Sequence, residues 1–369
     1  MSFCCENCFE DNFLKDYIKG HGSIGDCDYC GSLGVFCNSV SSLTDLFEPI
    51  VDLYEPLEKG THYLDDDNPS DFGDSLVQLI NDDWQTFSDE LIKSGQDGQL
   101  LEDIVNATRE PKEFIDTSGL WISKDRAFTS SLPEDHWEEF SDYIKRERRF
   151  ILSLPEYEDP REWLQHRFLL SEFTKPAGFC IFRARMGSLN VKGEKIPFDP
   201  IEMGSPPPEK TRAGRANPPG IPFLYTALDQ PTAVAEIRPW KGALVSVAIL
   251  VLTRQIVIID LANIPPIETP FGIESLNWVL ESRQMLSILG EKLCTPIDPQ
   301  TSEIEYVPTQ YITELIRDLR YDGILYKSAL GPNNNLVLFD PNSARVESVE
   351  LVHVADLHYT VEPYRPHYD

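Results

Sequence analysis

The chain has 369 residues, enough for two or three domains, and its apolar content of 41% is ordinary for a globular protein. Its formal net charge of −29 argues against general nucleic-acid binding, because phosphate contacts need clustered lysine and arginine. No run reaches the roughly 20 apolar residues of a membrane span, and the N-terminus lacks a basic region followed by an apolar core. We therefore expect a cytoplasmic protein that binds neither nucleic acid nor membrane, with its oligomeric state open.

Six of the eight cysteines fall within the first 37 residues. They include two Cys-x-x-Cys pairs, Cys5 with Cys8 and Cys27 with Cys30. Each pair supplies two thiolates from one tight turn, which suits a tetrahedral Cys4 zinc site of structural role. A site in which one of the spare ligands replaces one of these four cysteines is an alternative, and a disulfide framework is a less favoured one. The spare ligands are Cys4, Cys37 and His21.

The next part of the chain is predicted to be helical. Apolar residues recur at helical spacing in four stretches, 41–54, 72–87, 100–107 and 133–150. Further along, Arg161 and His166 fit the R-x4-H pattern that supplies an arginine and a histidine to RNA cleavage in HEPN ribonucleases. A two-residue pattern is weak, and the acidic chain argues against RNA. We interpret this segment as a helix that links two domains.

From about residue 177 the character changes to β. Apolar or β-branched runs predict strands at 178–185, 222–225, 242–252, 255–261, 321–328 and 335–339. Helices are predicted at 232–236, 276–293 and 306–317. The fold class is therefore α+β with three parts: a zinc-binding segment (1–38), a helical domain (39–175) and a mixed β domain with a C-terminal tail (176–369).

Residues 211–240 place basic and acidic groups close together in the sequence. Arg215 lies beside a rigid Asn-Pro-Pro-Gly turn, a short apolar strand follows, and a helical run ends at Glu236. A carboxylate at the end of an apolar run is costly to bury unless it has a partner or a task. Upstream, Arg183 and Arg185 share one face of a strand by its period of two, and an arginine there needs a partner as well.

Seven segments in order resemble the RES domain, a family named for an arginine, a glutamate and a serine. They are FRAR (182–185), GRANPPG (214–220), LYTA (224–227), TAVAEIRP (232–239), PTQYITELIR (308–317), YDGILYKSA (321–329) and NLVLFD (335–340). The resemblance implies that Arg183, Glu236 and Ser328 are the catalytic residues. Substrate is expected to be bound by Arg215, Asn217 and Tyr225. Gln310 is a weaker candidate for binding, and the alternative is that it only neighbours a helix cap. Many members have an aromatic residue where this chain has Ala216.

The same resemblance implies a fold and an activity. RES proteins resemble ADP-ribosyltransferases in fold, and characterised members break down NAD+ as toxins of toxin–antitoxin pairs. The cysteine-rich and helical front half is similar to the HEPN/RES N-terminal domain found fused to RES domains. We therefore expect NAD+ as the substrate and an antitoxin or defence partner as an interacting protein.

The residue types suit this chemistry. Cleavage between nicotinamide and ribose passes through an oxocarbenium-like transition state, which a carboxylate such as Glu236 stabilises. Guanidinium groups such as Arg183 and Arg215 pair with two pyrophosphate oxygens at once. Water and phosphate are both open as acceptors. A transferase that modifies a macromolecule is an alternative, although Val234 stands where transferases usually carry a polar residue that steers the acceptor. A nucleotide-binding protein without turnover is another.

Overall fold

The computed structural model describes residues 2–57, 73–124, 133–150, 160–297, 301–358, 361 and 363, without the side chains of 133–136 and 160–163. The chain divides into two compact units. The first comprises Met1–His136 and Pro266–Glu281, and the second comprises Trp137–Pro265 and Ser282–Asp369. The three-part division that we expect from the sequence remains a prediction.

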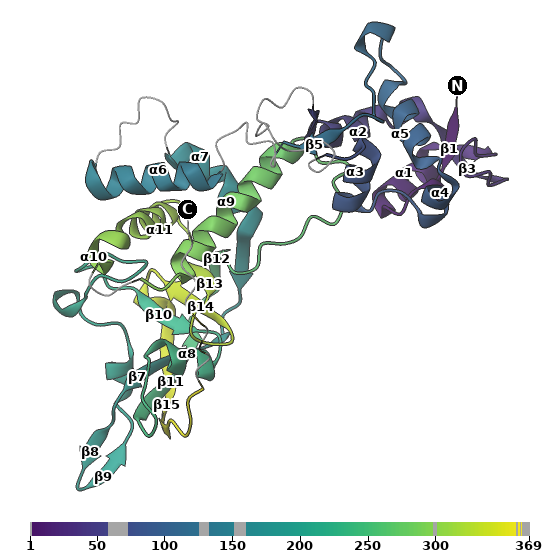
Figure 1. The fold of residues 1–369 in the computed structure, drawn as a ribbon. Coiled ribbons are helices and arrows are strands. Elements are labelled where there is room, and N and C mark those ends of the chain that lie inside the picture. Colours follow the sequence, from purple (N-terminus) through teal and green to yellow (C-terminus); the bar gives the residue numbers. More distant parts are fainter. Residues whose placement is uncertain are drawn as a thin grey trace. The chain divides into compact units, whose positions relative to one another are not determined.

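The first unit combines helices with two small sheets (Figure 1). Its strands are β1 (Phe3–Cys5), β2 (Ser23–Gly25), β3 (Val35–Ser39), β4 (Tyr54–Pro56) and β5 (Trp121–Ser123), paired in the orders β1-β3-β2 and β4-β5. Its helices are α1 (Asn12–His21), α2 (Thr44–Val51), α3 (Leu76–Trp84), α4 (Asp89–Ser94) and α5 (Asp97–Asn106). Apolar side chains at helical spacing, such as Phe47 and Ile50 of α2, are fully buried in one core.

Two helices contribute residues to both units. Helix α6 (Pro133–Arg146) begins at the end of the first unit, and α9 (Leu276–Cys294) begins in the first unit and ends in the second. The helices α7 (Pro160–Phe168), α8 (Gln230–Glu236), α10 (Ser302–Glu305) and α11 (Val307–Asp318) belong to the second unit. None of the helices within the described ranges is both long enough and apolar enough to cross a membrane.

A mixed eight-stranded sheet forms the centre of the second unit, in the order β15-β11-β7-β10-β14-β13-β12-β6 (Figure 1). The strands are β6 (Glu172–Lys175), β7 (Cys180–Met186), β10 (Leu224–Ala227), β11 (Leu244–Leu252), β12 (Ile256–Asp260), β13 (Gly323–Lys327), β14 (Asn334–Leu338) and β15 (Ala344–His353). A separate hairpin is formed by β8 (Leu189–Val191) and β9 (Glu194–Ile196). Only β12 and β13 pair in parallel among these neighbours, and the other pairs are antiparallel.

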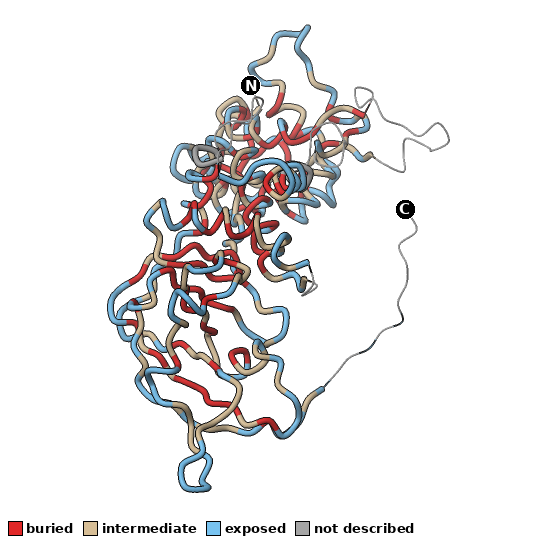
Figure 2. The backbone as a smooth tube through the Cα atoms, turned by 90° about the vertical axis from the view of Figure 1, so that its left-hand side faces the viewer, coloured by how far each residue is buried: buried red, intermediate tan, exposed pale blue. Residues whose placement is uncertain are grey.

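Both faces of this sheet are covered. Alternate residues along the strands enter different cores: Ile181 and Leu250 lie in one, and Ala184 and Val247 lie in another. Figure 2 shows the buried residues running along the strands of this unit. Helix α8 packs through Ala233 on the face that carries Ala184, so the sheet fixes the position of this short helix.

The pairing between β7 and β10 is limited. The two strands share a single register pair, Phe182 with Ala227, whereas β7 pairs with β11 over seven residues, Cys180–Met186. Beyond that single pair the ladder between β7 and β10 is not continued. Arg183 follows directly after Phe182, so it lies at the point where the two strands stop pairing.

The observed elements confirm most of the expected ones and add several strands. Helices α8, α9 and α11 and strands β7, β11, β12, β13 and β14 fall within a few residues of the predicted ranges. The ten-residue strand β15 was missed, because the sequence ARVESVELVH is polar and half of it faces solvent at the sheet edge. The short strands β1, β2 and β3 around the cysteines were missed as well, because three- to five-residue strands carry little periodicity.

Candidate functional site

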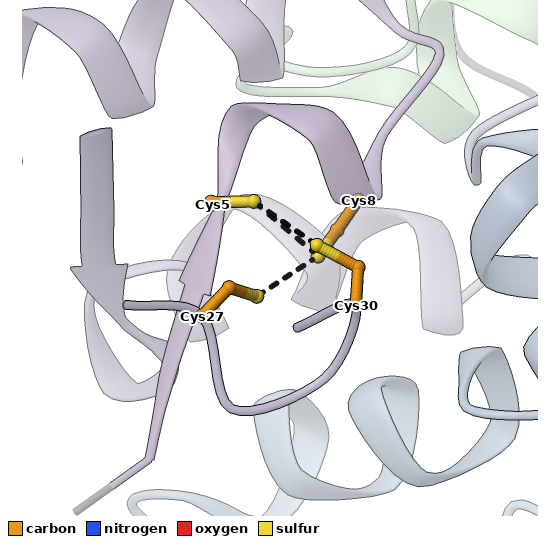
Figure 3. A group of neighbouring side chains, drawn as sticks. All are labelled: Cys5, Cys8, Cys27 and Cys30. Atoms are coloured by element: carbon orange, nitrogen blue, oxygen red, sulfur yellow. Dashed lines mark hydrogen bonds between the residues drawn. The ribbon is translucent and has the colours of Figure 1, made fainter. Parts of the chain in front are cut away.

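The four cysteines of the two predicted pairs lie together in the first unit (Figure 3). Cys5 ends β1 and Cys8 ends the turn that follows it, while Cys27 and Cys30 lie in the loop between β2 and β3. Their sulfur atoms all lie within 4.8 Å of one another. The sulfur–sulfur distances are 3.9 Å for Cys5–Cys8 and 3.4 Å for both Cys5–Cys30 and Cys8–Cys27.

These distances fit a tetrahedral metal ion. Four thiolates at about 2.3 Å from a zinc ion stand about 3.8 Å apart, and the cluster is close to that spacing. All four cysteines are free thiols, which disfavours the disulfide alternative. The pKa of the Cys5 thiol is raised to about 12 by the neighbouring Cys27 sulfur. Four crowded sulfurs therefore need a cation before all can ionise, and the cluster could hold a metal.

The spare ligands have other surroundings. Cys4 and Cys5 are neighbours on a strand and so point to opposite faces, and the Cys4 thiol approaches the Asn38 carbonyl oxygen at 3.8 Å. The His21 Nδ1 lies 2.9 Å from the Tyr17 carbonyl oxygen. Neither residue is a member of the four-sulfur cluster, and neither is Cys37.

In the second unit, α8 ends directly after Glu236. The Asp229 carboxylate caps the helix by accepting a hydrogen bond of 2.8 Å from the Thr232 backbone N–H. At the other end, Arg238 takes up φ of +47°, a left-handed conformation that stops the helix. Glu236 is therefore an exposed carboxylate at the negative end of a helix dipole, a position that disfavours an anion unless donors surround it.

Two donors meet this carboxylate, and both bind the same oxygen. The Ser328 hydroxyl lies 2.6 Å from Glu236 Oε1, and the Asn335 side-chain amide donates to Oε1 at 2.6 Å. Ser328 follows β13, and Asn335 lies in β14 with only 6% of its surface exposed. Hydrogen bonds to a carboxylate are short and strong, so these two contacts offset the unfavourable dipole.

The loop that carries Ser328 is packed tightly on α8. The Asn333 backbone N–H donates to the Thr232 hydroxyl at 3.0 Å, and the Ser328 N–H donates to the Asn333 carbonyl at 3.2 Å. Gly331 lies so close to the helix that a Cβ atom there would stand 2.5 Å from Thr232 Cα. The glycine therefore allows the loop to approach α8, which brings Ser328 to Glu236.

Arg183 and Arg185 have different environments. The Arg183 Nη1 donates to the Tyr225 backbone carbonyl at 2.7 Å, where β7 and β10 stop pairing. Burial, with a smaller contribution from Arg185, lowers the pKa of Arg183, although a guanidinium stays protonated. No carboxylate in the described ranges forms an ion pair with it. Arg185, by contrast, pairs with Glu202 at 3.7 Å and packs over the Phe198 ring.

Three of the predicted binding residues, Asn217, Tyr225 and Gln310, form a network that holds the turn of residues 211–221. The Asn217 Nδ2 lies within 3.1 Å of three carbonyl oxygens of this turn and shares its two hydrogens among them. The Tyr225 hydroxyl donates to Asn217 Oδ1 at 2.7 Å and accepts from the Ala216 N–H at 3.1 Å. Gln310 of α11 donates to the carbonyls of Gly214 and Asn217 at 2.8 and 3.0 Å. Burial raises the pKa of Tyr225, so its hydroxyl keeps the proton that it donates.

The side chain of Arg215 has its hydrogen-bond partners outside this turn. Its Nη1 donates to the carbonyl oxygens of Leu293 and Thr295 at the C-terminal end of α9. A cation at the negative end of a helix is favourable, so Arg215 has a structural partner in this state. The side chain of Arg161 lies outside the described residues, so the R-x4-H pattern with the exposed His166 stays untested.

The predicted site residues of the second unit thus fall into two groups, and the side chain of Arg215 belongs to neither. Glu236 and Ser328 are in direct contact, the turn residues contact one another, and Arg183 joins the turn through Tyr225. Within the described ranges, no hydrogen bond or ion pair joins Arg183 to Glu236 or Ser328. Asn335 belongs to the NLVLFD motif, but the sequence did not indicate it as a site residue. A polar residue at the start of a buried apolar strand is the signal that would have found it.

Two family models match the chain. The RES domain model matches residues 183–362, and the model of HEPN/RES N-terminal domain 1 matches residues 20–157. Among solved structures, the chain is similar to one in the crystal structure of the M. tuberculosis MbcT-MbcA toxin-antitoxin complex, with 14% identity and a TM-score of 0.33 over 53% of this chain and 94% of that chain. A TM-score of 0.33 supports no conclusion about this chain. No curated protein matches it.

Proposed function

Because this chain joins a HEPN/RES N-terminal domain 1 to a RES domain, we propose that it cleaves the bond between nicotinamide and ribose in NAD+. The observation that carries the proposal is the exposed Glu236 carboxylate, which Ser328 and Asn335 hold by one oxygen. The three predicted catalytic residues, Arg183, Glu236 and Ser328, keep that role as part of the proposal.

Glu236 is suited to stabilising positive charge. Loss of nicotinamide leaves an oxocarbenium-like ribose, and a carboxylate fixed beside that carbon lowers the energy of the transition state. A carboxylate held by two donors needs little reorganisation when the charge develops. The acceptor is a small nucleophile, water or phosphate. Val234, which lies two positions before Glu236, offers no polar group for steering a macromolecular acceptor.

The substrate's pyrophosphate needs cationic partners. Arg183 is suited to this role because it is partly buried and has no carboxylate partner within the described ranges, while one Nη1 bond to Tyr225 leaves further N–H groups free to donate. Arg215 reaches a phosphate only if it leaves the end of α9. Asn217, Tyr225 and Gln310 would then support the substrate by holding the turn that carries Arg215.

We also propose that Cys5, Cys8, Cys27 and Cys30 hold a structural Zn2+ ion in the first unit. Four cysteine ligands complete a tetrahedral site, so the ion would neutralise the thiolates and crosslink β1 to the loop before β3. Depletion of NAD+ would be toxic to the cell that makes the protein, so we propose that an antitoxin or defence partner restrains it.

The proposal is tested by incubating purified protein with NAD+ and resolving the products by mass, with and without added phosphate. Free nicotinamide with ADP-ribose would identify water as the acceptor, and ADP-ribose-1″-phosphate would identify phosphate. Glu236→Gln should lose this activity. Its control is Glu350→Gln, which removes an exposed carboxylate on the edge strand β15 and should react as the wild type does. If NAD+ persists with and without phosphate while it still binds, the proposed reaction is wrong and nucleotide binding without turnover gains support.

A further inference from the structure

The two oxygens of Glu236 are not equivalent. Oε1 accepts both short hydrogen bonds, one from Ser328 and one from Asn335, each at 2.6 Å. Within the part of the chain that the structure describes, Oε2 has no protein donor. Because α8 is fixed on the sheet and the carboxylate is held by Oε1, Oε2 is the oxygen that remains free to meet another molecule.

The Ser328 hydroxyl has its proton directed toward the carboxylate. Its oxygen accepts hydrogen bonds from the backbone N–H groups of Leu330 and Gly331, at 3.1 and 2.8 Å. A hydroxyl has two acceptor lone pairs and one proton, so these two contacts leave the proton for Glu236 Oε1. Ser328 is therefore arranged as a donor and not as a nucleophile.

Asn335 is the more rigid of the two donors. It lies in β14, which pairs with β10 on one side and β13 on the other, and its side chain is almost fully buried. The orientation of its amide follows from its partner, because a carboxylate oxygen only accepts and so must face the NH2 group. A buried amide on a central strand sets the position of the carboxylate more closely than a loop serine does.

We propose that Asn335 is a positioning residue of the RES domain, which holds Glu236 by Oε1 and thereby presents Oε2 to the ribose of the substrate. This inference rests on the function proposed above. Without the Asn335 amide, the carboxylate at the end of α8 keeps only the loop-borne Ser328 donor and can turn away from the substrate. Binding of the remote parts of NAD+ does not depend on this contact, so the effect falls on kcat and not on KM.

The test compares three variants with the wild type in NAD+ turnover. Asn335→Ala should lower kcat by about 10- to 100-fold, the range for losing a hydrogen bond to a charged group, and should change KM by less than about threefold. Asn334→Ala is the matched control, because it removes the same side chain from the neighbouring position of β14 on the opposite face. Its kcat should equal that of the wild type, and the thermal midpoint of each variant shows whether it is folded.

The pH dependence of the rate of Asn335→Asp distinguishes a positioning role from a merely structural one. Near pH 8 the introduced carboxylate faces Glu236 and repels it, so kcat falls at least as far as in Asn335→Ala. As the pH falls toward about 5, the pair takes up a proton, and the introduced carboxyl group can donate to Oε1 as the amide did. The rate relative to the wild type at the same pH should therefore rise about tenfold, while that of Asn335→Ala stays flat.

The outcomes separate the two proposals. A wild-type protein that consumes no NAD+ contradicts the proposed function, and the inference falls with it. A wild type that consumes NAD+ while folded Asn335→Ala is equally active overturns the inference alone. If Asn335→Asp is folded but stays inactive at every pH, while the wild type is active, the inference is also overturned.

Discussion

In the cysteine cluster all four sulfurs come from two short segments within the first 30 residues, whereas Glu236 meets partners that lie 92 and 99 positions further along the chain. Each Cys-x-x-Cys pair is close because of its local turn, so spacing alone brings its two sulfurs together. The carboxylate and its donors are close only because β13, β14 and α8 meet in the folded sheet. The first site depends on local geometry, and the second depends on the packing of the whole unit.

The largest effect is expected from Cys8→Ser. Cys8 and its neighbour Phe9 are fully buried, so removal of this ligand should release the metal and loosen the core of the first unit. Structural zinc sites contribute apparent binding free energies of about 10–16 kcal/mol to folding. The measurement is the metal content per chain by mass spectrometry, with far-ultraviolet circular dichroism of the same sample.

Cys4→Ala is the matched control for that change. Cys4 is as buried as Cys5 and adjacent to it, but it lies on the other face of β1 and outside the cluster. The variant should keep about one metal ion per chain. Loss of the metal in Cys4→Ala but not in Cys8→Ser would mean that the site uses a different set of ligands.

An intermediate effect is expected from Gly331→Ala, which acts on the carboxylate site through packing alone. The added Cβ would stand 2.5 Å from Thr232 Cα, so the loop must move away from α8 and carry Ser328 with it. Overpacking of this kind costs about 1–3 kcal/mol of stability. NAD+ turnover should fall about tenfold, because the displaced Ser328 hydroxyl no longer donates its hydrogen bond to the charged Glu236 carboxylate.

Gly204→Ala serves as its control. Gly204 has φ of −74°, and a Cβ atom there would meet no atom nearer than 3.9 Å. Its turnover and thermal midpoint should match those of the wild type. Unchanged turnover in Gly331→Ala would show that the close approach of the loop to α8 does not serve the site.

The smallest effect is expected from Tyr225→Phe, which removes one hydroxyl and keeps the ring. The hydroxyl donates to Asn217 and accepts from Ala216, so its loss should destabilise the second unit by about 1–2 kcal/mol. Denaturant unfolding measures this change, and NAD+ affinity should fall only as far as the turn loosens. Full stability combined with a loss of NAD+ affinity would mean that the hydroxyl binds substrate directly.

The difference between contacts that are local in the sequence and contacts that are distant explains which features could be predicted from the sequence. The α+β class and the helix that ends at Glu236 follow from local periodicity and capping residues, and the closeness of the four cysteines follows from their spacing. The resemblance to the RES domain indicated Glu236 and Ser328, which the structure brings together. Asn335 was missed because its partner lies 99 positions away, and its polar side chain at the start of a buried apolar strand was the only local signal.

The contacts of the arginines and of the turn residues could not be predicted, because their partners also lie far away in the sequence. The period of two places Arg183 and Arg185 on one face, but their partners come from β10 in one case and from the segment around Glu202 in the other. In the same way, the hydrogen bonds of Tyr225 and Gln310 hold the turn of residues 211–221, and their binding of substrate stays a prediction. A sequence pattern indicates which residues are unusual, and the fold decides which of them meet.

The most direct test of the account is to measure NAD+ binding and NAD+ turnover on the same sample of Glu236→Gln. A glutamine keeps an oxygen that can accept from Ser328 and Asn335, so the variant loses the charge while it can keep the position. We predict that Kd changes by less than about threefold while kcat falls by about 100-fold or more, because charge stabilisation acts in the transition state. Turnover at the wild-type rate in Glu236→Gln would contradict the account.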